Sequence, residues 1–168
     1  MASPITRAAF RTVLCPVKPP PPRAGGGGAG LSYSLTVPGE PRSAGLARAV
    51  VRSVLDAHGL RSFIVPVELA VSELVGIAVR LSPGEDLYLS LRRRAGEGGA
   101  ADADALRIVL WDRHPRHRDP DAESVCVARR RRALWLLAAV VDDWGGEWGF
   151  GDAQPPHRGK RSWVVLPR

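Results

Sequence analysis

The segment VSELVGIAVR, residues 71–80, lies in the stretch of sequence that decides the fold. Apolar residues recur here at the three- and four-residue spacing of one buried helix stripe, at Val67, Val71, Leu74, Val75 and Ala78. Pro66 suits the first turn of a helix, and Pro83-Gly84 would end it. The pattern therefore predicts a core helix that begins near Pro66 and ends before Pro83.

The flanking segments predict the rest of the fold. Alternating or continuous apolar residues predict strands over 31–37, 87–91, 106–111, 147–150 and 162–166, and the small, Gly-rich segment 95–104 predicts a hairpin loop. Helical spacing predicts a first helix that Ser43 caps and Gly59 ends, and a third from Glu123 to Asp143. This order predicts an α+β fold, a two-layer α/β sandwich with a mixed, mostly antiparallel sheet and about three helices on one face.

Composition limits the domain count and the compartment. The chain has 168 residues, 45% of them hydrophobic, and Pro and Gly runs at 19–22 and 25–28 predict a flexible tail over 1–30 before a single domain over 31–168. Cys15 and Cys126 stand far apart, so we expect no disulfide framework and a reducing compartment. No apolar run approaches the roughly 18 residues of a membrane span, and no signal peptide is evident. We therefore expect a cytoplasmic protein without a membrane partner.

The charged and histidine residues leave several interpretations open. A formal charge of +7 favours acidic partners but does not choose among nucleic acid, nucleotide and protein. The run Arg129 to Arg132 is a solvated helix start, a phosphate clamp or a nucleic-acid patch. No aromatic residues interleave with it, and the five Trp residues are expected to pack in the core and sheet, so nucleic acid is not the expected partner. His114 and His117 lack a second ligand pair, so no metal site is expected.

Four stretches in order resemble one known family. They are residues 71–80, Ile108-Val-Leu-Trp-Asp112, the segment 134–145 that closes with Asp143-Trp-Gly145, and the terminal 159–167. Together they resemble the anti-sigma-factor-like serine kinase branch of the Bergerat (histidine-kinase-like) ATPase family. The resemblance implies a Bergerat fold over 31–168 and a bacterial transcription regulator whose partner is a sigma factor or an anti-sigma antagonist protein. It also implies a homodimer.

The resemblance assigns a catalytic role to one residue and removes a metal ligand. Glu73 matches the family's base, which polarises a water or a substrate hydroxyl. Ile77, four residues later, stands where the family has the Asn that binds magnesium. Because Mg²⁺ requires oxygen ligands, isoleucine cannot replace that Asn. Magnesium is therefore not expected, and no residue is assigned as a metal ligand.

The same resemblance implies an ATP site with altered residues. Asp112 matches the acceptor of the adenine amino group, and a carboxylate can still accept that N–H. The first glycine box reads Asp112-Arg-His-Pro-Arg116, without its glycines. The second box would lie before the third helix, where Arg131, Arg132 and Ala133 stand. An arginine there would crowd a bound phosphate or supply its own charge to it.

These observations predict an ATP-binding regulatory protein of the anti-sigma, partner-switching type, with weak or lost kinase activity. Two alternatives remain. One is an active serine/threonine kinase that phosphorylates an anti-sigma antagonist, which would need another metal ligand in place of Ile77. The other is a basic nucleic-acid-binding module that uses the arginine surplus.

Overall fold

The computed structural model describes residues 31–94, 105–154 and 158–167. These residues all belong to the segment 31–168, over which a single domain is predicted. The tail predicted over 1–30 and the hairpin loop predicted over 95–104 lie outside the described residues.

Five strands form one sheet, and each neighbouring pair is antiparallel. They are β1 (Ser32–Val37), β2 (Leu87–Arg94), β3 (Ala105–Asp112), β4 (Glu147–Asp152) and β5 (Lys160–Pro167), in the spatial order β1-β2-β3-β5-β4. The sheet was predicted to be mixed but mostly antiparallel. Within the described residues it is antiparallel throughout.

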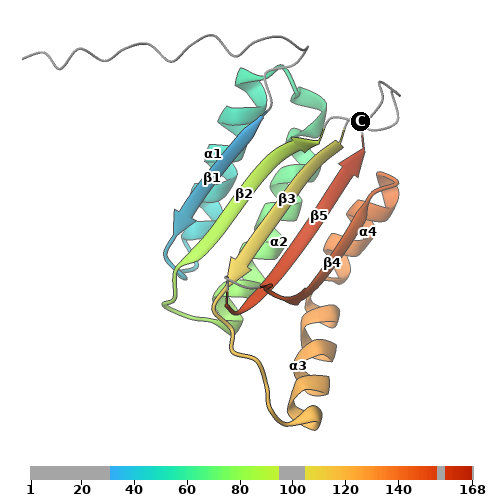
Figure 1. Ribbon diagram of the computed structural model, residues 1–168. Coiled ribbons are helices and arrows are strands. Elements are labelled where there is room, and N and C mark those ends of the chain that lie inside the picture. Colours follow the sequence, from blue (N-terminus) through green and yellow to red (C-terminus); the bar gives the residue numbers. More distant parts are fainter. Residues whose placement is uncertain (1–30, 95–104, 155–157, 168) are drawn as a thin grey trace, which may run out of the picture.

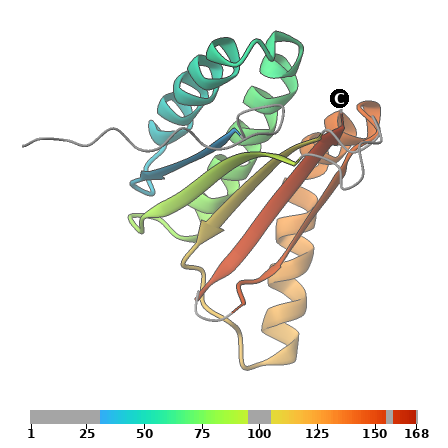
Figure 2. The ribbon, with the colours of Figure 1, turned by 45° about the horizontal axis from the view of Figure 1, so that its top comes forward.

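Helices cover one face of this sheet (Figure 1). They are α1 (Ser43–Ala57), α2 (Ile64–Leu81), α3 (Pro120–Ala133) and α4 (Trp135–Asp143), with a short 3-10 turn, η1 (Arg61–Phe63), before α2. Viewed from a second direction, α1, α2 and α4 back the sheet, while α3 extends past its end (Figure 2). The predicted α+β fold, a two-layer α/β sandwich with helices on one side, is confirmed.

Two details of the predicted helices are wrong. The single helix predicted from Glu123 to Asp143 is two helices, because the chain leaves helical geometry at Leu134 (φ −95°, ψ 17°). The N–H of Leu134 donates to the carbonyls of Arg130 and Arg131, at 3.1 and 3.2 Å. Ser43 does not cap α1 but begins it, and its hydroxyl donates to the carbonyl of Pro38 at 2.6 Å.

Helix α2 is the centre of the helical layer. Its buried side chains include the predicted stripe Val67, Val71, Leu74, Val75 and Ala78. By length and composition the segment Arg61–Leu81 could cross a membrane, since its most apolar window has a mean hydropathy of 1.9. In this fold 56% of that window is buried inside the domain, as in the core helix of a soluble protein.

The two faces of the sheet differ in chemistry. Leu87, Leu89 and Leu91 on β2 are buried against the helices, whereas Tyr88 and Arg92 are exposed. The alternation follows from the pleat, which sends successive side chains to opposite faces. The sheet therefore has an apolar face under the helices and a polar, basic face that no described helix covers.

Gly159, just before β5, lies close against the backbone at the end of β3. It adopts φ +92°, and an added Cβ would collide with the carbonyl oxygen of Asp112. Gly151, in the same hairpin, has no positive φ and open space around it.

We expect Gly159→Ala to destabilise the domain by about 1–3 kcal/mol, because an L side chain is strained at this φ and meets backbone. Urea unfolding measures the effect, with Gly151→Ala as the matched control. Equal unfolding midpoints for the two variants would contradict the close approach of Gly159 to Asp112.

Candidate functional site

Three charged residues form a row across one end of the sheet. Asp112 on β3 is in register with Lys160 on β5, and Lys160 is in register with Asp152 on β4. Lys160 is only 6% exposed, and its Nζ lies 2.6 Å from Asp152 Oδ1 and 3.6 Å from Glu123 Oε1 on α3. The hydrogen bond from Lys160 holds the pKa of Asp152 below its ordinary value. The row thus ties the last strand of the sheet to its neighbour and to α3.

Arg130 of α3 makes a buried ion pair with Asp112. Its Nη1 donates to Asp112 Oδ2 at 2.9 Å and to Ser162 Oγ at 3.1 Å, and the two charged side chains are 2% and 0% exposed. The other carboxylate oxygen of Asp112 accepts the N–H of His114 at 3.0 Å. Both oxygens of Asp112 are therefore already engaged within the protein.

This pairing changes the chemistry expected of Asp112. A carboxylate that accepts the adenine amino group needs an open oxygen, but here Arg130 lies against it. To accept the adenine amino group, Asp112 would have to share an oxygen with Arg130 or His114, or release the guanidinium, which would then be left buried or would have to move into water. The structure therefore assigns Asp112 a stabilising ion pair in the state described.

Sequence reasoning missed Arg130 as a buried residue. It is the buried residue of α3, although the four-arginine run indicates a solvated surface. A usable signal existed, because Arg130 lies four residues before Leu134 and continues the stripe of Leu134, Leu137 and Val141. Its Nη2 has no hydrogen-bond partner among the described residues.

The residues of the predicted second glycine box lie in the last turn of α3. Arg131 and Arg132 are exposed, while Ala133 packs against the core. Arg131 and Arg130 line a cavity of about 520 Å³ that also contacts Trp148 and Phe150. Because the N–H of Leu134 is already bonded to two carbonyls of α3, it is not free for a phosphate at the start of α4.

Glu73 and Ile77 are not joined to this network. Glu73 is half-buried on α2 and makes no hydrogen bond or ion pair with another residue of the described ranges. Ile77 is 2% exposed and belongs to the hydrophobic core. The side chain at the position of the family's magnesium ligand is thus a packing residue.

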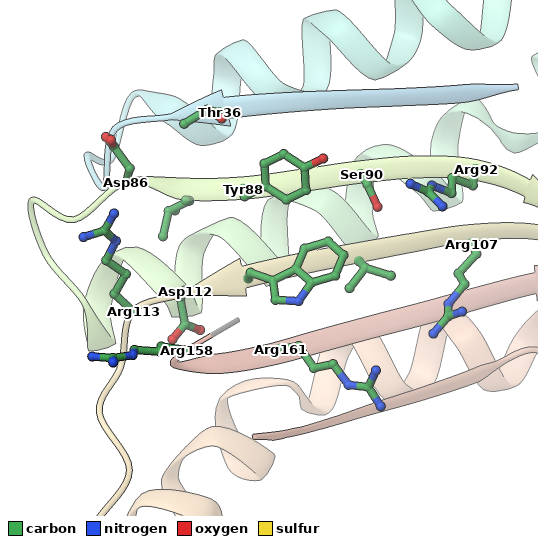
Figure 3. Close-up of a pocket in the computed structure, with 13 residues that line it drawn as sticks. Thr36, Asp86, Tyr88, Ser90, Arg92, Arg107, Asp112, Arg113, Arg158 and Arg161 are labelled. Atoms are coloured by element: carbon green, nitrogen blue, oxygen red, sulfur yellow. The ribbon is translucent and has the colours of Figure 1, made fainter. Parts of the chain in front are cut away.

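A second cavity, of about 670 Å³, lies on the open face of the sheet (Figure 3). Five arginines line it: Arg92, Arg107, Arg113, Arg158 and Arg161. Tyr88 and Trp111 pack together among them, with ring centroids 5.3 Å apart, and Arg107 Nε is buried with no hydrogen-bond partner in the part of the chain that the structure describes. Aromatic and basic side chains therefore share this face, although the tryptophans were expected to pack in the core and sheet.

No family model matches this chain, and no curated protein matches it. The function must therefore be argued from the residues and their geometry.

We expect Asp112→Ala to destabilise the domain by about 3–5 kcal/mol, because it leaves the buried guanidinium of Arg130 uncompensated. The double variant Asp112→Leu/Arg130→Met should recover most of this loss, since it removes both charges. Urea unfolding measures each variant, and Arg131→Met, at the exposed neighbouring position, is the control and should change stability by less than about 0.5 kcal/mol. If Asp112→Ala costs no more than Arg131→Met, the buried pair is not formed.

Proposed function

We propose that this chain is a cytoplasmic regulatory protein of the anti-sigma, partner-switching type that binds a protein partner without transferring phosphate. The observation that carries the proposal is the ion pair between Arg130 and Asp112. The residue that would contact adenine in a working kinase instead holds a helix in place. This favours a binding protein over an enzyme.

The surroundings of Ile77 support the loss of kinase activity. In phosphoryl transfer, the metal neutralises the phosphate oxygens while the nucleophile attacks. Ile77 offers only hydrocarbon and is packed in the core, and Glu73 without an activated phosphate would do little. An active serine/threonine kinase therefore needs a metal ligand that the resemblance does not supply.

ATP enters this proposal as a weak ligand. On this proposal, adenine binds Asp112 in molecules from which Arg130 has moved away. If such molecules are a small fraction of the total, the apparent affinity for ATP is reduced in proportion to that fraction. The exposed guanidinium of Arg131, beside the cavity of about 520 Å³, could still attract a phosphate. We therefore expect nucleotide binding that does not depend on magnesium.

The partner surface that we propose is the outer face of α1 and α2. Val65 and Leu69 stand one turn apart on α2 and are 65% and 39% exposed, and Leu46 on α1 is 53% exposed. Arg52 and Glu68 form a bidentate ion pair on the same helices, with both N–O distances 2.7 Å. Apolar side chains surrounded by charged ones are typical of a protein interface.

The full chain should bind one member of a panel of sigma factors and anti-sigma antagonist proteins with unchanged affinity when ATP and Mg²⁺ are added. Val65→Glu/Leu69→Glu should weaken this binding at least about tenfold, because it buries charge in the interface. Biolayer interferometry gives the affinities, and radiolabelled ATP in the same mixtures should give no phosphorylated partner. Val125→Glu, at a 60% exposed apolar position on α3, is the matched control.

Two results would overturn the proposal. Phosphorylation of a panel member by the natural chain would show an active kinase. Failure of the entire panel to bind would remove the anti-sigma assignment. Light scattering on the free chain measures its molar mass in solution. A mass twice that of one chain would indicate the homodimer that the resemblance implies.

A second candidate function is binding of single-stranded nucleic acid on the open face of the sheet. The observation that favours it is the Tyr88–Trp111 pair between arginines in the cavity of about 670 Å³. Bases stack on aromatic rings, while arginine side chains contact the phosphates. A basic sheet face with partly exposed aromatic rings suits an extended nucleic-acid strand.

If this candidate is correct, Tyr88→Ala and Arg161→Glu should each weaken binding of a fluorescent oligonucleotide at least about fivefold, by the loss of stacking or of charge. The logarithm of the binding constant should fall with the logarithm of salt concentration, with a slope of about −0.7 for each contacted phosphate. The control is Arg129→Glu, because Arg129 is exposed on α3 and the substitution makes the same charge change away from the sheet. An equal loss in Arg129→Glu, together with full binding by Tyr88→Ala, would indicate only the general attraction of a basic protein.

A further inference from the structure

Three side chains beside the Arg130–Asp112 pair converge on one point. His114 and His117, between β3 and α3, have their Nε2 atoms 3.1 Å apart. Cys126 on α3 places its Sγ 3.2 Å from His114 Nε2, and the three ligand atoms all lie within 4.8 Å of one another. All three side chains are half-buried. No metal site was expected from the sequence, because His114 and His117 lack a second ligand pair at ligand spacing.

The hydrogen bond at the other nitrogen of His114 orients the ring. His114 Nδ1 lies 3.1 Å from the carbonyl oxygen of Leu81, at the end of α2. Since a carbonyl only accepts, Nδ1 must carry a proton, and in the neutral ring Nε2 then presents a lone pair. A backbone carbonyl that fixes the tautomer of a histidine in this way is the usual outer partner of a metal-binding imidazole.

We propose that His114, His117 and Cys126 bind a zinc ion. With metal–ligand distances of about 2.0 Å to nitrogen and 2.3 Å to sulfur, tetrahedral geometry needs separations of roughly 3.3 Å between nitrogens and roughly 3.5 Å between nitrogen and sulfur. The observed 3.1 and 3.2 Å require the two pairs that involve His114 to open by a few tenths of an ångström. The ligand atoms of His117 and Cys126, which lie within 4.8 Å of each other, must also come to the nitrogen–sulfur separation. Two imidazoles and a thiolate favour zinc over magnesium or calcium, which prefer oxygen.

The three proposed ligand residues all line a cavity of about 380 Å³, from which a fourth ligand could reach the zinc ion. Asp119 and Asp121 line this cavity, so the remaining ligand is a water molecule or one of these carboxylates. Arg129 also lines it, and the two aspartates offset its charge. On binding, the Cys126 thiol loses its proton to solvent and its sulfur bonds to the metal.

A zinc ion here would give α3 a further attachment. Arg130 ties α3 to β3, and Cys126 lies four residues earlier on the same side of the helix. Through His114 the metal would also link α3 to the end of α2. We infer that the ion fixes the orientation of α3 relative to the sheet.

The test is a titration of the full chain with Zn²⁺ and with Co²⁺, in a Cys15→Ser background that leaves Cys126 as the one thiol. Calorimetry should give one zinc per chain, and Co²⁺ should give the absorption of a tetrahedral thiolate complex. Free zinc at 100 times its Kd should raise the Tm by roughly 5–15 °C. Cys126→Ser and His117→Asn should each weaken zinc binding at least about tenfold and remove the Tm shift.

The control is His58→Asn, because His58 contacts Tyr33 and lies outside the cluster. It should leave zinc affinity unchanged. No stoichiometric binding, or binding equally strong in Cys126→Ser and His117→Asn, would overturn the proposal. Since neither ATP nor a protein partner is used, the outcome is independent of the proposed regulatory function.

Discussion

The buried ion pair between Arg130 and Asp112 is the interaction on which one end of the molecule depends. A guanidinium loses its hydration when it is buried, so it is retained only where a carboxylate and further acceptors replace water. Asp112 supplies the negative charge and Ser162 supplies a second acceptor. Together they hold α3 against β3 and β5. The Lys160–Asp152 pair beside it extends the same arrangement to β4. Without these charges α3 would have little to hold it, because most of its residues are exposed.

Sequence periodicity predicted most of the fold, and the exceptions have physical causes. The α2 stripe and the alternating strands were correct because burial on one face imposes a period on the sequence. The break at Leu134 could not be predicted, since leucine favours helix and the interruption is one residue long. Ser43 looked like a cap, but its hydroxyl bonds to Pro38 in a turn set by tertiary structure. Such contacts leave no period in the sequence.

The candidate sites were harder to predict than the fold, because they join residues from separate elements. Glu73 and Asp112 were chosen by position in a resemblance, which says nothing about what lies beside them in this chain. The partner of Asp112 comes from 18 residues later and reaches it only because α3 folds back against the sheet. Likewise His114 and Cys126 are 12 residues apart, with a helix beginning between them, so no spacing rule brings them together. The basic open face of the sheet was also not predicted, because its arginines are spread over several strands.

The projection of α3 past the sheet has a mechanical consequence. Its 14 residues make a rod about 21 Å long, anchored by the buried Arg130 near its C-terminal end, while near its N-terminal end the partly exposed Glu123 lies 3.6 Å from Lys160. A tilt of roughly 10° about the C-terminal end of α3 would move its first turn by roughly 4 Å. A change of less than an ångström beside Arg130 is therefore magnified several-fold at the tip. A helix anchored in this way would act as a lever, because a small movement at the Arg130–Asp112 pair would give a larger displacement at the first turn of α3.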